Sequence, residues 1–239
     1  MKAMLLAAGE GRRLRSLTDR IPKPMLRIAG RPILEYNIRL LAYYGFREII
    51  INLYHCPEVV TDYFGDGSRW GVSIRYSLEE KLLGTAGAVK RVQAFFDQTF
   101  LVMYGDNLTN CNLNALLARH RATSAMATVA LFYRQDVSAS GVAVLSEEDR
   151  IRRFIEKPQM NSVSSHWVNA GLLVLEPQVL QFIPEDHPVD FGYDVLPALI
   201  AEGLPVFGYR MTEKLWWIDT PEAYEQVRLL GEKGGLELP

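Results

Sequence analysis

Leu6-Ala7-Ala8-Gly9-Glu10-Gly11-Arg12-Arg13-Leu14 is a glycine-containing, cationic stretch that begins at the last of the apolar residues 3–6. Glycine lets a backbone approach an anion closely, and free N–H groups together with arginine and lysine side chains form an electropositive cradle. Lys23 adds a further cation ten residues after Arg13. A polyphosphate ligand is the first hypothesis.

Two better-known phosphate-binding loops do not fit this stretch. Gly9-x-Gly11 lacks the third glycine of a dinucleotide-binding fingerprint, because Leu14 occupies that place. The Gly-Lys-Ser/Thr ending of a P-loop is absent as well. For Gly-x-Gly alone, a strand-to-helix turn with solvated arginines is the alternative interpretation, since such short motifs are common.

The whole N-terminal segment resembles the sugar-1-phosphate nucleotidylyltransferases, also called nucleotide-sugar pyrophosphorylases. The resemblance rests on the stretch 6–14, on Leu17-Thr18 and on Pro22-Lys23-Pro24-Met25, all at fixed spacing. Arg12 and Ser16 depart from it, because the family commonly has Thr and Pro there. The resemblance implies a nucleotidyltransferase type A-like fold and an enzyme that joins a sugar 1-phosphate to a nucleoside triphosphate with Mg²⁺ as cofactor.

The composition sets limits on the partners. The chain has 239 residues, 49% of them hydrophobic, so it can build a sizeable core. Its formal net charge of −2 gives no basic field for nucleic acid or for an anionic membrane. We therefore expect small-molecule substrates, no nucleic acid and no membrane, and leave a homo-oligomer open.

The cysteines and the N-terminus indicate the compartment. Cys56 and Cys111 are the only cysteines and have no metal-binding spacing, so free thiols are expected. The polar Glu10 and Arg12 follow the first apolar run too soon for a signal peptide or a membrane span. A cytoplasmic protein is the prediction.

Strands and helices are expected to alternate in the first half of the chain. The expected strands there are Ala3–Ala7, Glu48–Leu53, Val72–Tyr76 and Phe100–Tyr104, and the expected helices are Pro32–Tyr44, Glu58–Phe64, Thr85–Phe96 and Asn112–Arg121. This alternation predicts an α/β, Rossmann-like fold with a mixed, mostly parallel sheet and helices on both faces.

The pattern then changes to consecutive strands. The expected strands are Ala127–Tyr133, Gly141–Leu145, Ile151–Glu156, Trp167–Leu175 and Val206–Tyr209, and the expected helices are Tyr193–Glu202 and Pro221–Leu230. We interpret residues 1–239 as one nucleotidyltransferase domain, with a nucleotide-binding lobe over 1–125 and a sugar-binding lobe over 126–239. The C-terminal β-helix of hexapeptide repeats that several pyrophosphorylases carry is not expected.

Two aspartates are the candidate metal ligands. Asp106 follows the strand that ends at Tyr104, and open α/β sheets bind ligands at the carboxyl ends of their strands, although an Asx turn or helix cap is the alternative. Trp217-Ile218-Asp219-Thr220 resembles the late Trp-x-Asp motif of the family. The resemblance assigns Asp106 and Asp219 to Mg²⁺, which commonly takes only one or two protein carboxylates. Asp219 or Thr220 could instead cap the helix that begins with Pro221.

The resemblance assigns the catalytic role to Arg13, Lys23 and Asp106. Arg13 would neutralise the leaving pyrophosphate, and Lys23 would contact the phosphates at the reacting centre, where charge accumulates. The neighbouring Arg12 and Arg15 are interpreted as solvated loop residues. A sugar phosphate is already an anionic nucleophile, so the chemistry needs alignment and charge neutralisation without a general base.

Further residues are assigned to the substrates by the same resemblance. The nucleotide-binding set is Leu6, Ala8, Gly9, Gly11, Gly84 and Thr85, and the sugar-phosphate-binding set is Gly141, Glu156, Lys157 and Asn169. Carboxylate and amide groups supply the acceptors and donors that sugar hydroxyls need. Helix capping by Thr85 is the alternative for the loop at 83–88.

The loop Leu83-Gly84-Thr85-Ala86-Gly87-Ala88 most resembles guanylyltransferases acting on mannose or heptose 1-phosphates. GTP with a manno-configured sugar is therefore the first hypothesis for the substrates. Thymidylyl-, uridylyl- and cytidylyltransferases share nearly all of these motifs and stay open. A non-catalytic sugar-nucleotide-binding regulator is the alternative from another class, because a fold alone does not fix a function.

Overall fold

The computed structural model describes residues 1–159 and 163–238, which form two compact units that interleave along the sequence. Unit 1 comprises Met1–Leu82, Met103–Cys111 and Glu213–Pro239, and unit 2 comprises Leu83–Val102 and Asn112–Thr212. The units are defined by contacts within the chain and have other bounds than the predicted lobes. The single domain 1–239, with a nucleotide-binding lobe over 1–125 and a sugar-binding lobe over 126–239, stays a prediction.

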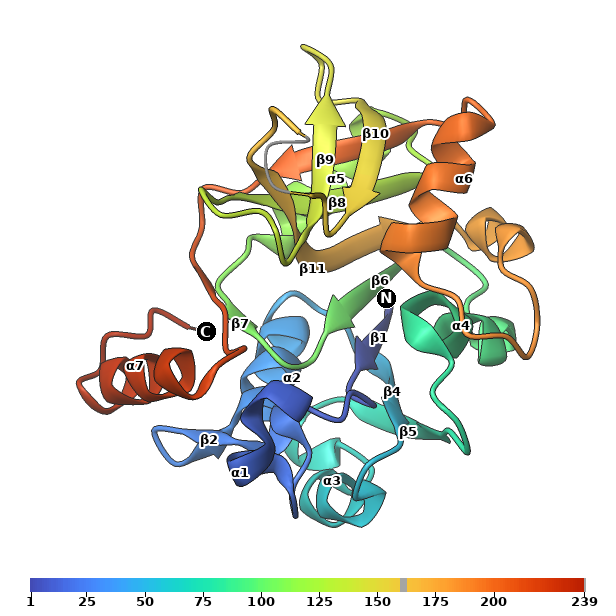
Figure 1. Cartoon of the computed structure of the whole chain (residues 1–239). Coiled ribbons are helices and arrows are strands. Elements are labelled where there is room, and N and C mark those ends of the chain that lie inside the picture. The colour runs from blue at the N-terminus through green and yellow to red at the C-terminus, as the bar shows by residue number, and fades with distance from the viewer. Residues whose placement is uncertain (160–162, 239) are drawn as a thin grey trace. The chain divides into compact units, whose positions relative to one another are not determined.

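Unit 1 contains a parallel sheet with helices in the connections (Figure 1). Its elements are β1 (Lys2–Leu6), α2 (Ile33–Tyr43), β4 (Glu48–Leu53), α3 (Pro57–Phe64) and β5 (Ser73–Leu78). β4 pairs with both β1 and β5, and the register places Leu6, Asn52 and Ser77 side by side. Because parallel strands end at the same edge, the segments that follow these three residues start close together.

Smaller elements complete unit 1. They are α1 (Arg15–Thr18), the hairpin of β2 (Arg27–Ile28) and β3 (Arg31–Pro32), the antiparallel pair β7 (Leu108–Thr109) and β13 (Leu215–Trp216), and α7 (Pro221–Glu232). Figure 1 shows α7, drawn in red, beside the blue β2, although nearly two hundred residues of sequence separate them.

Unit 2 is built mainly on antiparallel pairs. Its strands are β8 (Ala127–Tyr133), β9 (Gly141–Leu145), β10 (Ile151–Glu156), β11 (Trp167–Leu175) and β12 (Val206–Arg210), and its helices are α4 (Gly84–Arg91), α5 (Leu113–Ala122) and α6 (Leu196–Ala201). β11 pairs antiparallel with β8 and β9, β9 pairs with β10, and β12 lies parallel to β8. The chain crosses between the units within β6 (Phe100–Tyr104).

The predicted fold class is confirmed: the chain is α/β with a mixed sheet, whose parallel part in unit 1 alternates with helices as expected.

The helix predicted over Tyr193–Glu202 is wrong at its start, because residues Phe191–Val195 form a π-helical turn and α6 begins only at Leu196. Asp190 explains this, since its Oδ1 accepts hydrogen bonds from the Gly192 and Tyr193 amides. The helix predicted over Thr85–Phe96 ends early, at Arg91, and a 3₁₀ turn follows.

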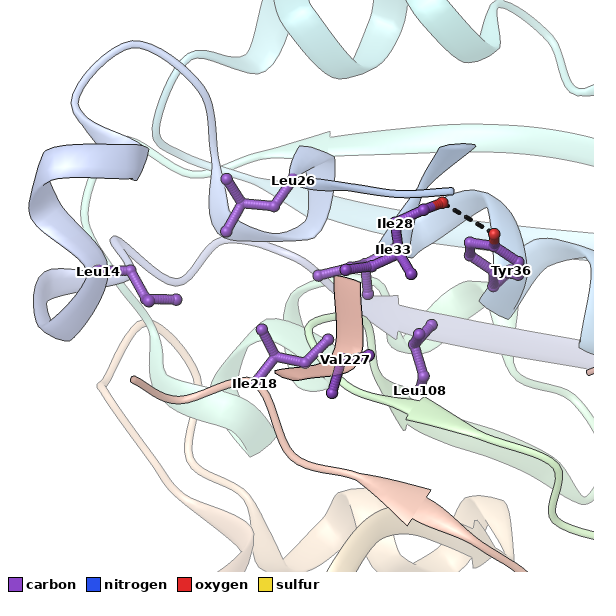
Figure 2. Packing of buried hydrophobic residues seen from close by; sticks show 8 residues of the cluster. All are labelled: Leu14, Leu26, Ile28, Ile33, Tyr36, Leu108, Ile218 and Val227. Carbon is purple, nitrogen blue, oxygen red and sulfur yellow. Dashed lines mark hydrogen bonds between the residues drawn. The ribbon is translucent and has the colours of Figure 1, made fainter. Parts of the chain in front are cut away.

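One hydrophobic cluster holds the segments of unit 1 together (Figure 2). Its buried members are Leu14, Leu26, Ile28, Ile33, Tyr36, Leu108, Ile218 and Val227. They come from the N-terminal loop, the β2 region, α2, β7 and the start and middle of the C-terminal segment. The Tyr36 hydroxyl donates a 2.9 Å hydrogen bond to the Ile28 carbonyl within the cluster, so this hydroxyl is satisfied (Figure 2).

The helices of residues 1–159 and 163–238 include none that is both long and apolar enough to cross a membrane.

Truncating Ile218 should destabilise the protein. The side chain is fully buried in the cluster, so Ile218→Ala leaves a cavity and should lower the free energy of unfolding by about 2–5 kcal/mol. Denaturant unfolding measures this loss. Leu229→Ala is the matched control, because Leu229 on α7 is 42% exposed and its truncation should change stability by less than about 0.5 kcal/mol. Equal effects of the two variants would contradict the assignment of Ile218 to the core.

Candidate functional site

The Lys23 ammonium lies between two carboxylates in unit 1. Its Nζ is 2.7 Å from Asp106 Oδ2 and 2.7 Å from Asp219 Oδ1. The Arg13 guanidinium binds the other oxygen of Asp219, with Nη2 3.2 Å from Oδ2. Two cations and two carboxylates predicted from distant motifs are therefore brought together.

The backbone around Lys23 is rigid. Pro22 and Pro24 flank it, and residues 23–25 form a 3₁₀ turn in which the Leu26 amide donates to the Lys23 carbonyl. Gly11 packs closely against this turn, since a Cβ there would lie 3.1 Å from the Lys23 Cβ. Gly11 also has a φ of 59°, a conformation that glycine adopts without strain. The lysine stem is thus fixed at its base.

Burial and pairing act in opposite directions on Lys23. Burial disfavours the charged ammonium, but the charges and hydrogen bonds of Asp106 and Asp219 outweigh it, so the pKa of Lys23 lies above its ordinary value. The Lys23 side chain is only 7% exposed, whereas Asp106 and Asp219 are 33% and 25% exposed. Solvent therefore reaches the carboxylates more easily than the ammonium.

The structure separates two alternatives at the start of α7. Thr220 is the helix cap, because its Oγ1 accepts a hydrogen bond from the Ala223 amide. Asp219 instead turns to Lys23 and Arg13. The aspartate of the Trp-x-Asp motif, Asp219, is thus available for the site, while its neighbour Thr220 caps the helix.

Asn107 connects the segments that carry the two carboxylates. Its Oδ1 accepts a 3.3 Å hydrogen bond from the Ile218 amide, one residue before Asp219. Its carbonyl accepts from Asn37 Nδ2 of α2 at 3.1 Å. Since Asn107 directly follows Asp106, this buried amide fixes the position of Asp106 relative to the segment of Asp219.

The donor set fits Mg²⁺. Asp106 and Asp219 already meet at a single cation, and both offer only oxygen, the ligand that this metal prefers. Within the described part of the chain, no group of three or more His, Cys, Asp or Glu side chains could hold a metal. Two carboxylates are nevertheless sufficient, because Mg²⁺ completes its octahedron with water and phosphate oxygens.

The loop after β1 leaves room for a ligand at Gly9. No atom of the described residues lies within 4 Å of the point where a Cβ of Gly9 would stand, so internal packing does not require glycine there. The Leu6 carbonyl accepts from the Gly105 amide, which ties the loop to the segment of Asp106. The Ala8 side chain is buried.

A buried polar chain follows the ends of the three parallel strands of unit 1. The Ala7 amide donates to Asn52 Oδ1 at 2.9 Å, and Asn52 Nδ2 donates to Glu79 Oε1 at 2.7 Å. Asn52 and Glu79 are both buried. The Asn52 side chain thereby links the Ala7 amide to the Glu79 carboxylate.

In unit 2, the segment of Gly84 and Thr85 packs against residues 187–191. Gly84 has a φ of 74°, and a Cβ there would meet the Val189 carbonyl, which already accepts from the Ala86 and Gly87 amides. Thr85 Oγ1 donates to Asp190 Oδ2 at 2.9 Å and accepts from the Phe191 amide. Thr85 is thus no helix cap, and its hydroxyl holds this segment in place; its nucleotide contact stays a prediction.

Glu156 occupies a cradle between two glycines. A Cβ at either Gly141 or Gly192 would meet the Glu156 carboxylate, so glycine at both positions makes space for it. Burial, together with the nearby charge of Asp190, raises the pKa of Glu156 to about 7, although Lys157 acts in the opposite direction. Among the residues that the structure describes, none donates a hydrogen bond to this carboxylate.

Lys157 has an unusual backbone conformation, and the Asn169 side chain binds a backbone amide. Lys157 has a φ of 46°, a strained conformation for a non-glycine residue, and its Nζ lies 5.7 Å from the centre of the Tyr193 ring. Asn169 Oδ1 accepts from the Gly171 amide at 2.8 Å, where the register of β11 shifts. Their contacts with a sugar phosphate stay predictions.

Comparisons with known proteins identify the family. Residues 2–228 match the family model described as nucleotidyl transferase. The chain belongs to the nucleotidyl transferase family. It is 38% identical, over 95% of its length, to UTP–glucose-1-phosphate uridylyltransferase of Synechocystis sp., and 37% identical, over 93%, to mannose-1-phosphate guanylyltransferase of Mycobacterium tuberculosis. It spans 63% and 62% of the lengths of these two relatives.

A solved structure supports the fold of this nucleotidyl transferase family member. The crystal structure of HddC from Yersinia pseudotuberculosis has a TM-score of 0.80 to this chain at 23% identity. The likeness covers 95% of this chain and 98% of that one. The fold is therefore shared at low sequence identity.

Asn52, Glu79 and Asn107 are candidate site residues that the sequence reasoning did not assign. Asn52 interrupts an otherwise apolar run, Ile49-Ile50-Ile51-Asn52-Leu53, and a polar residue in a buried strand is a recognisable signal. Asn107 and Glu79 follow strand ends, where polar residues are ordinary, so their partners appear only in the structure.

The raised pKa of Glu156 predicts a pH-dependent stability. The pKa of this carboxyl is about 7 in the folded protein and 4.5 in the unfolded chain, so the folded protein favours the protonated form. The free energy of unfolding therefore falls as pH rises from 4.5 to about 7 and the carboxyl loses its proton. Glu156→Gln should therefore gain thermal stability relative to wild type as pH rises from about 5 to 8. Melting temperatures across this range measure the difference, with Glu147→Gln, an exposed carboxyl of unit 2, as the charge-matched control. A gain that is constant with pH would contradict this prediction.

Proposed function

We propose that the protein transfers a nucleotidyl group from a nucleoside triphosphate to a sugar 1-phosphate, giving a nucleoside diphosphate sugar and pyrophosphate. The observation that carries this proposal is the site of Lys23, Arg13, Asp106 and Asp219 in a member of the nucleotidyl transferase family. The free thiols Cys56 and Cys111 support a cytoplasmic location.

The reaction places demands that these residues can meet. A phosphate oxygen of the sugar 1-phosphate forms a bond to the α-phosphorus, and the bond between the α-phosphorus and the bridging oxygen breaks, so that pyrophosphate leaves with the electron pair. Lys23 and Arg13 neutralise charge on the reacting and leaving phosphates. Asp106 and Asp219 would hold Mg²⁺, which would supply further charge neutralisation for the phosphate oxygens.

Unit 2 supplies the groups for the sugar phosphate. The Glu156 carboxylate lies in its glycine cradle without a donor from the described residues, and sugar hydroxyls are suitable donors. Lys157 offers a cation next to it for the phosphate, and strain at Lys157 is the kind that functional sites retain. Asn169 and the Gly141 backbone complete the proposed set.

Removing one carboxylate or the buried cation should abolish most turnover. Asp106→Asn or Lys23→Ala should each lower the rate of pyrophosphate release by at least about 100-fold, because charge neutralisation supplies most of the catalysis. Circular dichroism should show that both variants keep the fold. Asp62→Asn, an exposed aspartate on α3, is the matched control and should keep wild-type turnover.

A thermal-shift panel of nucleoside triphosphates and sugar 1-phosphates with Mg²⁺ selects the substrates for this assay. Near-normal turnover in Asp106→Asn would show that the assignment is wrong. Stabilisation of the wild type without any turnover would instead indicate a binding protein that regulates a partner.

We propose GTP as the nucleotide, with a mannose- or heptose-type sugar. The buried Glu79 carboxylate, which Asn52 links to the Ala7 amide, supports this choice. A carboxylate only accepts hydrogen bonds, and the N1–H and N2–H₂ groups of guanine form a pair of donors. Uracil and thymine present one N–H between two carbonyl oxygens, which a carboxylate repels.

Exchange of this carboxylate for an amide should change the base preference. Glu79→Gln should lower kcat/KM for GTP by about 10- to 100-fold and narrow the gap to UTP, because an amide can pair with a uracil edge. Steady-state kinetics with GTP, UTP, TTP and CTP measure the preference. Glu80→Gln, the exposed neighbour, is the control and should keep the wild-type order. An unchanged order in Glu79→Gln would exclude Glu79 as the group that reads the base.

A further inference from the structure

We propose that the Lys23 ammonium is an internal competitor for the metal: it occupies the cation position between Asp106 and Asp219, and a divalent cation binds both carboxylates only when Lys23 leaves them. This inference rests on the proposed function, from which it takes the two carboxylates as metal ligands. In this order of events, Lys23 releases the two carboxylates before a metal ion binds both of them.

The ammonium occupies the position between one oxygen of each carboxylate. Nζ of Lys23 lies 2.7 Å from one oxygen of each carboxylate, a short distance for a charge-assisted hydrogen bond. Mg²⁺ binds carboxylate oxygens at about 2.0–2.1 Å. An ion bound to the same two oxygens would lie next to the ammonium, and two adjacent cations repel each other.

The ammonium can move while its backbone stays in place. Pro22, Pro24 and the 3₁₀ turn fix the main chain, and Gly11 packs against the Lys23 Cβ. Movement is therefore restricted to the torsions of the four-carbon side chain. Arg13 is paired with Oδ2 of Asp219 and not with the oxygen that Lys23 contacts.

A displaced ammonium needs another anion. Lys23 is 5% exposed, and a lysine charge that loses both partners at such a site is costly. The triphosphate is the anion that the proposed reaction brings to the site. Metal and triphosphate should therefore bind together, each making the binding of the other more favourable, and free metal should bind weakly.

Mn²⁺ binding without nucleotide tests the competition directly. Electron paramagnetic resonance of free Mn²⁺, at constant pH and ionic strength, gives its affinity for wild type and for Lys23→Met. The variant should bind Mn²⁺ at least about tenfold more tightly than wild type, because the competing ammonium is gone. Lys23→Met should also lose transferase turnover, so that tighter metal binding accompanies lower activity.

Two further variants separate competition from a general change in charge. Lys90→Met removes a half-buried lysine of unit 2 that bonds the Leu180 carbonyl, and it should bind Mn²⁺ like wild type. The double variant Lys23→Met with Asp106→Asn should lose the gain, because one of the two ligands is missing. Lys23→Gln, whose neutral amide keeps a hydrogen-bond donor, should show a gain in affinity and replaces Lys23→Met if that variant does not fold.

Failure of this inference is distinguishable from failure of the proposed function. If the wild-type protein turns over its substrates but neither Lys23→Met nor Lys23→Gln changes the Mn²⁺ affinity, the competition is disproved and the proposed function is unaffected. A gain that persists in the double variant would also overturn it, since the ion would then bind elsewhere. Tight Mn²⁺ binding by Lys23→Met, with no transferase turnover from wild type, would support the competition and contradict the function.

Discussion

The contact of one buried ammonium with two carboxylates is the constraint on which the arrangement of unit 1 depends. Lys23 reaches Asp106, 83 residues later, and Asp219, 196 residues later. A buried charge that loses its partners is strongly destabilising. The N-terminal turn, the end of β6 and the segment before α7 must therefore all reach their places before the ammonium is stable. The same contact assembles, from three distant parts of the sequence, the charges that phosphate chemistry requires.

The hydrophobic cluster supplies the energy that holds this arrangement. Leu14 directly follows Arg13, and Ile218 directly precedes Asp219, while Leu26 and Leu108 lie within three residues of Lys23 and Asp106. Each charged residue is thus attached to a buried apolar neighbour, so that burial of the cluster positions the charges. The paired charges contribute little net stability of their own, because desolvation offsets much of the attraction between them. Apolar burial fixes the positions, and the charges are then available for chemistry.

The sequence predicted what short-range patterns encode. The strands at Glu48–Leu53, Phe100–Tyr104, Ala127–Tyr133 and Trp167–Leu175 agree residue for residue with the structure, because each is a long run of apolar residues. The two-residue strands β2, β3, β7 and β13 are too short to leave a pattern, and the turn at Phe191–Val195 depends on the side chain of Asp190. The family resemblance singled out Lys23, Asp106 and Asp219, which the structure brings together, and left helix capping as the alternative for Asp219. The bridges made by Asn107 and Asn52 could not be predicted, since each joins segments that only the tertiary fold brings together.

The two units treat their charged groups differently, and the difference follows from what each group must do. In unit 1 the carboxylates are compensated by Lys23 and Arg13, so the protein bears two exchangeable anionic groups without leaving them unpaired. In unit 2 the Glu156 carboxylate is half-buried, and its pKa of about 7 shows that the fold disfavours its charge. In the proposed function Lys23 is a substitute for the metal cation, whereas sugar hydroxyl groups are neutral and have no such substitute among the charged side chains. The proposed sugar site would instead be kept open by space, which the glycines at 141 and 192 provide around the Glu156 carboxylate.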